Sequence, residues 1–380
     1  MTILGVLPTF SLLKKRVLEH LIPIAYFISG HGYGHAVRSS QVILRLKEAC
    51  PELDFHVRTG APRWFLHHLP FPVSHAEQPI DVGIVQRDSL QMNIEETLHA
   101  CESLHERMPA LIEENLAFIE QQKIRLILGD IPPLCFEIAR RASVPAVAIG
   151  NFTWDWIYRA YLADFPAFLP LIEEMQSFYR AASLALCLPF SCDMKIFPNQ
   201  KSIPLISRLS ALDKIEAKKR FAFPATAVVV LISFGGFGLE RLPWERLSCL
   251  GDFFFVTTGS APRREKNLLV LSEQLPHYED LIRASDVVVT KPGYGIVADV
   301  IAHQVPLLYT SRSNFPEYPY LVEALNRWAT SEFIPQEEVL AGELGPYLER
   351  LMDKEQHWPT IPLNGAQVAA ERILELVDRG

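Results

Sequence analysis

The strongest constraint on the fold of this chain is the alternation of short apolar runs with glycine turns and helical segments. One such unit begins with the apolar run Ile22–Ser29, which leads through a glycine-rich turn into an amphipathic stretch from about Ser39 to Ala49. The pattern restarts at Ala227–Ser233, which precedes a second glycine-rich turn at 235–238. Strands that alternate with helices in two successive blocks are typical of two Rossmann-like domains.

A polar stretch around 207–224, rich in Lys and Glu, separates the two blocks. The length of 380 residues also favours two domains over one. We therefore predict an α/β fold with an N-terminal domain over residues 1–210 and a C-terminal domain over residues 211–380. Apolar runs predict further strands at Leu53–Thr59, Ile124–Asp130, Val144–Gly150, Leu184–Pro189, Ile203–Ile206, Phe253–Thr257 and Pro306–Thr310. Helices are predicted at Ile94–Gln122, 132–142, Phe165–Ala182, Tyr278–Ala284, Tyr318–Asn326, Glu337–Lys354 and Ala366–Asp378.

Composition argues against several classes of partner. The 36 Lys and Arg residues are outnumbered by 44 Asp and Glu residues, so the net charge of −8 does not favour a nucleic-acid-binding surface. No apolar run reaches the roughly 18 residues of a membrane span, and the charges in 1–23 follow its apolar part instead of preceding it as in a secretory signal. The six cysteines form no CxxC pair, so we expect reduced thiols in a cytoplasmic protein and no zinc site.

The segment 286–306 carries the clearest indication of a ligand site. It is interpreted as a buried strand at Val287–Thr290, a turn containing Gly293 and Gly295, and a helix at Ile296–His303 that contains Asp299. Free N–H groups at a helix start bind anions, and glycine lets a phosphate approach closely. A nucleotide diphosphate would place its phosphates on the turn and its ribose hydroxyls on the carboxylate. An ordinary strand–helix corner with turn glycines is the alternative.

Two Rossmann-like domains with such a turn in the second resemble the GT-B glycosyltransferases. In that superfamily a Glu for the ribose follows a glycine by six residues, and here Asp299 stands six residues after Gly293. The resemblance implies a phosphate-facing cation at Lys291, where the UDP-sugar enzymes often carry His, and a second diphosphate loop at Gly235 and Gly236. It also implies that the last helix packs back on the first domain. The other donor contacts that it implies are His277 and Tyr278 near the nucleobase, Tyr294 in the turn, and Asn314 and Glu317 near the donor sugar.

A closer resemblance covers nearly the whole chain. The segments 29–38 (Ser-Gly-His-Gly-Tyr-Gly-His-Ala-Val-Arg), 151–156 (Asn-Phe-Thr-Trp-Asp-Trp), 233–236 and 291–295 are similar to the glycosyltransferase-like N-terminal half of plant L-arabinokinases. The ATP loop of the kinase half of those proteins is absent from this sequence, so the resemblance does not imply kinase activity. The activity of the shared half does not follow from it either.

Inverting transfer needs a base that takes the proton of the acceptor hydroxyl, and a histidine held by a carboxylate suits this role. We predict His35 as the base, because it matches the Gly-His of the superfamily's first turn. Asp130 is its predicted partner, because it ends a strand and the carboxyl ends of parallel strands share one edge of the sheet. His31 is the rival base, and the alternative is that both histidines only bond the turn or contact the donor phosphate.

The remaining expectations concern the leaving group, the acceptor and the reaction. Helix starts and Lys291 could stabilise a leaving diphosphate, and the chain has no Asp-x-Asp motif, so we expect neither a metal nor another cofactor. The expected reaction is sugar transfer from a nucleotide sugar, with a UDP-sugar favoured, to an acceptor that the sequence does not identify. The alternatives are epimerisation or hydrolysis of a nucleotide sugar in the same cleft, and a catalytically silent nucleotide-sugar binding module. Residues on predicted loops near strand ends in the N-terminal domain are candidates for acceptor contacts, although each is individually more typical of packing or of the surface: Arg38, Arg87, Asp88, Trp154 and Asp155.

Overall fold

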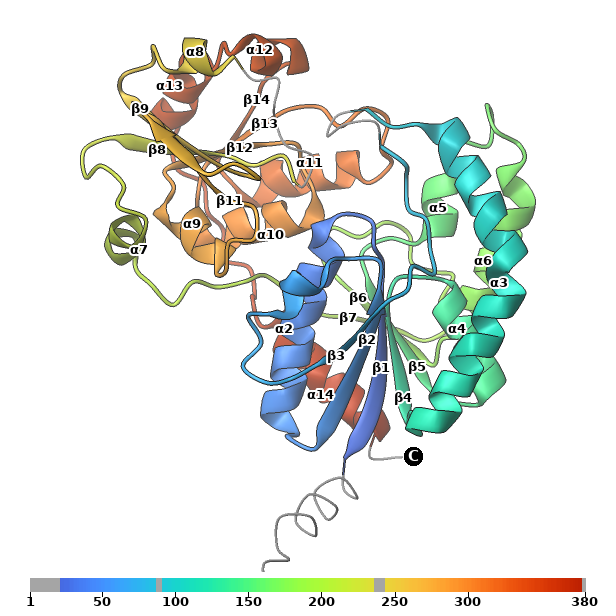
Figure 1. The fold of residues 1–380 in the computed structure, drawn as a ribbon. Helices are drawn as coiled ribbons and strands as arrows, with labels where there is room; N and C mark the ends of the chain where they lie inside the picture. Colours follow the sequence, from blue (N-terminus) through green and yellow to red (C-terminus); the bar gives the residue numbers. More distant parts are fainter. Residues whose placement is uncertain (1–20, 87–90, 236–242, 378–380) are drawn as a thin grey trace, which may run out of the picture.

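The computed structural model describes residues 21–86, 91–235 and 243–377, which form two α/β domains, each built on a seven-stranded sheet (Figure 1). The first sheet is parallel throughout, in the order β3-β2-β1-β4-β5-β6-β7. Its strands are β1 (Ile22–Ile28), β2 (Leu53–Thr59), β3 (Ser74–Glu77), β4 (Leu126–Asp130), β5 (Ala146–Gly150), β6 (Leu184–Cys187) and β7 (Gln200–Ser202).

The second sheet has the order β10-β11-β9-β8-β12-β13-β14, and only β10 runs antiparallel. Its strands are β8 (Val228–Ile232), β9 (Phe253–Gly259), β10 (Arg263–Glu265), β11 (Leu268–Ser272), β12 (Val287–Thr290), β13 (Leu307–Tyr309) and β14 (Ser331–Phe333). In each sheet the first strand of the domain, β1 or β8, lies in the interior, and later strands were added in parallel on both sides of it. This order is that of doubly wound domains.

Helices cover both faces of each sheet, which explains why the central strands are apolar throughout. In β1, for example, Ile24 and Tyr26 pack towards α2 while Ala25 and Phe27 pack towards α3 and α4. The helices of the first half of the chain are α2 (Tyr33–Ala49), the short 3₁₀ helix η1 (Arg63–Leu66), α3 (Ile94–Gln122), α4 (Leu134–Ala142), α5 (Trp154–Arg159) and α6 (Phe168–Tyr179). Those of the second half are α7 (Lys214–Arg220), α8 (Trp244–Leu247), α9 (Tyr278–Ala284), α10 (Tyr294–His303), α11 (Tyr318–Trp328), α12 (Gln336–Ala341), α13 (Gly345–Asp353) and α14 (Gly365–Val377).

The chain passes between the domains twice. It leaves the first domain after β7, and it returns after α13 so that α14 packs against α2 in the first domain (Figure 1). The two passing segments contact each other, because Leu205 N–H donates to the Pro362 carbonyl at 3.1 Å and Gly365 N–H donates to the Leu205 carbonyl at 3.1 Å. A Cβ at Gly365 would collide with the Pro204 carbonyl, so this position requires glycine.

Several element predictions need correction. Helix α2 begins at Tyr33 and not near Ser39. The turn ends at Gly32, whose φ is 69°, and the helix starts at the next residue. The strand predicted at Ile203–Ile206 is wrong, and the edge strand β7 precedes it. The helix predicted over Glu337–Lys354 is two helices, interrupted at Gly342, where φ is 77°. No helix in the described part of the chain is long and apolar enough to cross a membrane.

Candidate active site between the two domains

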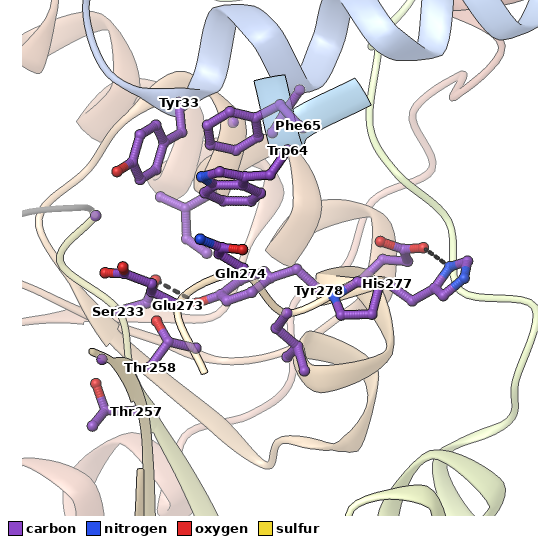
Figure 2. A pocket seen from close by; sticks show the side chains of 18 of the residues that line it. Tyr33, Trp64, Phe65, Ser233, Thr257, Thr258, Glu273, Gln274, His277 and Tyr278 are labelled. Carbon is purple, nitrogen blue, oxygen red and sulfur yellow. Dashed lines mark hydrogen bonds and ion pairs between the residues drawn. The ribbon is translucent and has the colours of Figure 1, made fainter. Parts of the chain in front are cut away.

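A cavity of about 790 Å³ lies between the two domains, at the carboxyl ends of strands from both sheets (Figure 2). The N-terminal domain contributes the start of α2 and the segment around η1. The C-terminal domain contributes the ends of β8, β9 and β11 and the starts of α9 and α10. The predicted donor residues that line the cavity are Gly235, His277, Tyr278, Gly295 and Asp299.

The N-termini of α2 and α10 meet at the edge of this cavity. A Cβ placed on Gly295 would lie 3.5 Å from Cα of Gly34, and one on Gly34 would lie 3.8 Å from the Gly295 nitrogen. Two glycines therefore allow this close approach of two helices. Each helix start carries a partial positive charge and unsatisfied N–H groups, so the junction attracts anions. Gly293 precedes α10 in an extended conformation, which places Tyr294 and Gly295 in the first turn of the helix.

Asp299 lies on the cavity wall but already has a protein partner. It accepts the Arg208 backbone N–H at 3.1 Å on one oxygen and the Arg208 guanidinium at 2.8 Å on the other, and it is 2 % exposed. One turn later, His303 donates from Nδ1 to the Asp299 carbonyl at 2.8 Å and accepts the Ser210 N–H on Nε2 at 3.0 Å. Helix α10 thus holds the segment that enters the second domain. The sequence did not predict this structural role for Asp299.

The side chains of His277 and Tyr278 differ in their exposure to the cavity. The Tyr278 hydroxyl donates to Ser233 Oγ at 2.7 Å, which ties the start of α9 to the end of β8. His277 is exposed and pairs with Glu279, with 3.1 Å between Nδ1 and Oε1. Both residues line the cavity at the start of α9.

The predicted contact between His35 and Asp130 is present. His35 Nδ1 lies 2.8 Å from Asp130 Oδ1, and Asp130 is fully buried. Burial would raise the pKa of Asp130, but the Arg38 guanidinium outweighs burial and holds that pKa at about 2. The ionised carboxylate is an acceptor and favours the tautomer with the proton on Nδ1, which in the neutral ring leaves a lone pair on Nε2. A terminal nitrogen of Arg38 also lies 3.0 Å from Nδ1.

Arg38 is not available to an acceptor, contrary to the prediction. Its side chain is 4 % exposed and donates to both oxygens of Asp130, at 2.7 Å from Nε and 2.5 Å from a terminal nitrogen. Ser39 Oγ donates to the same carboxylate at 2.9 Å. Asp130 therefore holds a histidine, an arginine and a serine together at the start of α2.

Arg38 also begins a chain of buried polar contacts that crosses to the second domain, which we call the interdomain relay. Arg38 donates to Asn151 Oδ1 at 2.8 Å, Asn151 donates to Glu317 Oε1 at 2.7 Å, and Arg312 donates to Glu317 Oε2 at 3.0 Å. Asn151 is fully buried and Glu317 is 4 % exposed. Glu317 does not line the cavity, and each of its oxygens already has a partner in the relay, so its predicted contact with the donor sugar stays a prediction.

The rival base, His31, has no free lone pair. Its Nδ1 accepts the backbone N–H of Ile84 at 3.2 Å, so the neutral ring carries its proton on Nε2. Burial, followed by the charges of Arg312 and Lys291 and the nearby His35, lowers the pKa of His31 well below its usual value. His31 thus remains neutral and anchors the turn, which is the alternative role that the sequence left open.

Aromatic side chains fill the interface next to the histidines. Phe315, from the segment before α11, is 1 % exposed; its ring lies parallel to that of His31 at 6.1 Å and edge-on to Phe152 at 6.3 Å. The ring of Phe152 is 5.7 Å from His35. The neighbouring Asn314 accepts the Tyr161 hydroxyl on its carbonyl at 3.1 Å and does not line the cavity.

The remaining predicted acceptor residues that the structure describes are buried and have protein partners. The predicted loop at 151–156 contains the start of α5, where Trp154 is 1 % exposed and donates from Nε1 to Asp81 at 2.9 Å. Asp155 is 4 % exposed and accepts from Gln176 at 3.1 Å. Tyr294, which was predicted to contact the donor, is 7 % exposed, and the centre of its ring lies 5.4 Å from the Arg38 guanidinium. Arg87, Asp88 and Gly236 lie outside the described residues.

The structure adds cavity residues that the sequence reading missed: Tyr33, Trp64, Phe65, Thr257, Thr258, Glu273 and Gln274 (Figure 2). The pair Trp64–Phe65 follows the turn after β2, at the same sheet edge as the turn after β1, and that shared edge is the signal that could have identified it. Within the described residues, no group of three or more His, Cys, Asp or Glu side chains could hold a metal ion.

Comparison with known proteins gives relatives of two kinds. No family model matches the chain. L-arabinokinase of Arabidopsis thaliana is 27% identical over 365 residues, which are 94% of this chain but only 34% of that protein, so this chain spans about one third of the length of its relative.

Solved structures with the same architecture include the glycotransferase of kitacinnamycin, with a TM-score of 0.60, 16% identity and 94% of both chains covered. The UGT2 of Phytolacca americana in complex with UDP-2fluoro-glucose and pterostilbene matches with a TM-score of 0.60, 13% identity and 94% of both chains. A putative UDP-N-acetylglucosamine 2-epimerase from Listeria monocytogenes matches with a TM-score of 0.56, 13% identity, and 93% of this chain and 95% of the other. The chain therefore has the GT-B fold, and over nearly its whole length it is similar in sequence to part of L-arabinokinase.

Proposed function

We propose that this protein is a glycosyltransferase that takes its sugar from a nucleotide sugar bound in the interdomain cavity. The observation that carries the proposal is the junction of Gly34 and Gly295, where two helix N-termini meet at the edge of a cavity of about 790 Å³. A diphosphate at this junction would accept N–H groups from both domains. The cavity volume lies within the range of about 300–1,000 Å³ that is usual for small-molecule sites.

The nucleoside would extend from this junction along the carboxyl ends of β8, β9 and β11, where the polar wall of the cavity lies. The ribose would reach Asp299 on the acceptor positions that Arg208 leaves open, since each carboxylate oxygen has two. A uracil base is favoured because two of the similar structures bear the names of a UDP-sugar complex and of a UDP-sugar enzyme. The helix starts would stabilise the leaving diphosphate, so we propose that the transfer needs no metal.

The base in this proposal is His35. Its Nε2 lone pair would take the proton of the acceptor hydroxyl as that oxygen attacks the anomeric carbon, and a single displacement of this kind inverts the configuration. Asp130 would hold the ring through Nδ1, as observed. Because Arg38 neutralises Asp130, the carboxylate would serve mainly to orient the ring and to fix its tautomer.

A second candidate function is favoured by the packing around His35. Phe152 and Trp154 lie beside this ring, Phe315 lies edge-on to Phe152, and His35 is 6 % exposed, so the described residues leave little room for an acceptor there in this arrangement of the domains. A reaction that needs only the nucleotide sugar, such as its hydrolysis or epimerisation, fits a closed site without an acceptor. The two functions differ in whether donor turnover requires an added acceptor.

A thermal-shift panel of nucleotide sugars and free nucleotides, followed by mass spectrometry of the products with and without a crude acceptor extract, tests both candidates. A ligand at one hundred times its Kd stabilises the folded protein by about 2.7 kcal/mol, which such a panel detects easily. A product that forms only with the extract supports transfer, and donor turnover without it supports hydrolysis or epimerisation. Stabilisation with no product in either case would indicate a silent binding module. The absence of stabilisation by every nucleotide would falsify the proposal.

A further inference from the structure

We propose that Trp64, supported by Phe65 and Tyr33, forms the half of the nucleobase site that the N-terminal domain supplies. In this arrangement the base of the donor is stacked on an aromatic wall of one domain while its edge is read by the other. The inference rests on the proposed function, because it assigns a residue set to one part of the same ligand.

The aromatic wall is a cluster of three rings, of which two are stacked and the third is tilted against them. Tyr33 is the first residue of α2, and Trp64 and Phe65 belong to η1. The rings of Trp64 and Phe65 are stacked at 3.8 Å with 28° between their planes, and Tyr33 lies 4.5 Å from Phe65. Phe65 is 7 % exposed and backs the other two, so the half-buried Trp64 and the 37 % exposed Tyr33 present their rings to the cavity.

The wall that faces these rings is polar. Figure 2 shows the three rings along one side of the cavity, with Gln274 just beneath Trp64 and Thr257 and Thr258 farther away, at the end of β9. An amide side chain such as Gln274 offers both donors and an acceptor, and a threonine hydroxyl offers one donor and two acceptor positions, although the Thr257 hydroxyl already donates to the Ile232 carbonyl at 2.9 Å. An apolar planar face opposite a set of donors and acceptors matches a ligand whose faces are aromatic and whose edge is polar.

The position of the wall selects the nucleobase among the parts of a nucleotide sugar. In the proposed function the diphosphate lies at the helix junction of Gly34 and Gly295, and the sugar to be transferred lies towards His35, which is 6 % exposed and is not itself a lining residue of the cavity. Tyr33 and the residues after β2 lie on the opposite side of α2's first turn from Asp130, because β2 and β4 flank β1 in the sheet. The nucleoside end of the ligand is the part left for this side of the cavity.

Stacking of a base on an aromatic side chain is sequence-tolerant and contributes about 1–3 kcal/mol by alanine substitution. At 1.4 kcal/mol for each factor of ten, Trp64→Ala should weaken nucleoside diphosphate binding about tenfold. Because the stack and the polar wall belong to different domains, this contribution is available only when the domains are closed on the ligand.

The test compares the affinities of uridine diphosphate, guanosine diphosphate and inorganic pyrophosphate by isothermal titration calorimetry. Trp64→Ala is expected to lower the affinity for both nucleotides about tenfold. The affinity for pyrophosphate, which has no base, should be unchanged. Trp64→Phe keeps a ring and should bind nucleotide nearly as wild type, but it should lose the part of the nucleotide-induced fluorescence change that comes from Trp64 and keep any part from Trp244, which also lines the cavity. Trp358→Ala is the matched control, because Trp358 is also half-buried and does not line the cavity.

Nucleotide binding by Trp64→Ala that equals wild type would overturn the inference while leaving the proposed function intact. An equal loss of nucleotide and pyrophosphate affinity would also overturn it, because the residue would then act on the phosphate site or on the fold. If the wild-type protein binds none of the three probes, the proposed function and this inference both fail. Should Trp64→Ala not fold, the Trp64→Phe variant decides the matter: an unchanged fluorescence response would show that Trp64 does not contact the base.

Discussion

Removal of the Arg38 guanidinium is the most informative perturbation of this structure, because that group supports two buried partners at once. In the variant Arg38→Met, Asp130 would keep His35 and Ser39 but lose its only buried cation in direct contact, and Asn151 Oδ1 would lose its donor. Methionine fills a similar volume, so the change is chiefly electrostatic. The prediction is that this variant is much less stable than wild type at neutral pH.

The magnitude follows from the depressed pKa of Asp130. A shift from the ordinary 3.8 to about 2 corresponds, at 1.36 kcal/mol for each pKa unit, to about 2 kcal/mol of stability at neutral pH. The unpaired amide oxygen of Asn151 adds about 1–3 kcal/mol. We therefore expect Arg38→Met to lower the free energy of unfolding by about 3–5 kcal/mol, in line with other broken buried pairs.

The pH dependence of this difference is a second, independent expectation. The folded pKa of Asp130 lies below the unfolded value, so its contribution is complete well above pH 4 and is lost as the pH falls towards 2. In the variant, the buried carboxyl keeps His35 and Ser39 but has no guanidinium beside it, so burial opposes its ionisation. The difference in unfolding free energy between wild type and variant should therefore shrink by at least about 1 kcal/mol between pH 7 and pH 3.

Urea unfolding followed by circular dichroism at pH 7, 5 and 3 measures both quantities. The matched control is Arg45→Met on the same helix, because Arg45 is about half exposed and pairs only with the exposed Glu48. That change should alter stability by no more than about 0.5 kcal/mol. The reasoning is refuted if Arg38→Met is within about 1 kcal/mol of Arg45→Met at pH 7, or if the difference from wild type does not shrink in acid.

Four further predictions follow from the same interface. Phe315→Ala should cost about 3–5 kcal/mol because it empties a buried aromatic site between the domains, and an unchanged melting temperature would contradict this. His35→Ala should lower kcat by about 10²–10⁴ with little effect on nucleotide affinity; intact turnover with lost binding would remove the base assignment. Asp299→Asn should destabilise the protein by about 1–3 kcal/mol, because Arg208 loses its carboxylate partner, and equal urea midpoints would refute that. Donor turnover should be unaffected by a chelator, and sensitivity to it would show that the leaving diphosphate needs a metal.

The parts of the fold that could be predicted are those with a strong local pattern. The bounds of α3 and α9 agree with the predicted helices, because each has a clear apolar period or a well-marked start. The strands β7, β10 and β14 have only three residues each and include charged or polar side chains, so no alternation identifies them. Helix α5 was not predicted, because the aromatic residues at its start follow a strand end and are typical of a loop there.

For the candidate site, the topology of the sheet was the reliable guide. The contact between His35 and Asp130 follows from two neighbouring strand ends, although the residues are 95 positions apart. The partners Asn151 and Glu317 are 166 positions apart and lie in different domains, so no pattern within a domain could pair them. The acceptor predictions placed Trp154 and Asp155 on exposed loops, whereas contacts within the first domain, to Asp81 and to Gln176 of α6, accompany their burial.

The two passages of the chain between the domains have a mechanical consequence. Because Leu205 and Gly365 bind each other's segments beside the first domain, both connections leave that domain from one fixed point. Two connecting segments held together in this way permit a hinge rotation of the second domain, but they resist its rotation about the axis that joins the domains. Arg208 and Ser210 are bound to α10 and His357 is bound to Thr330, so opening of the cavity should pivot on the short segments between these contacts and the anchors, 206–207 and 358–361. Cleavage of one connection alone would leave the domains joined by the other.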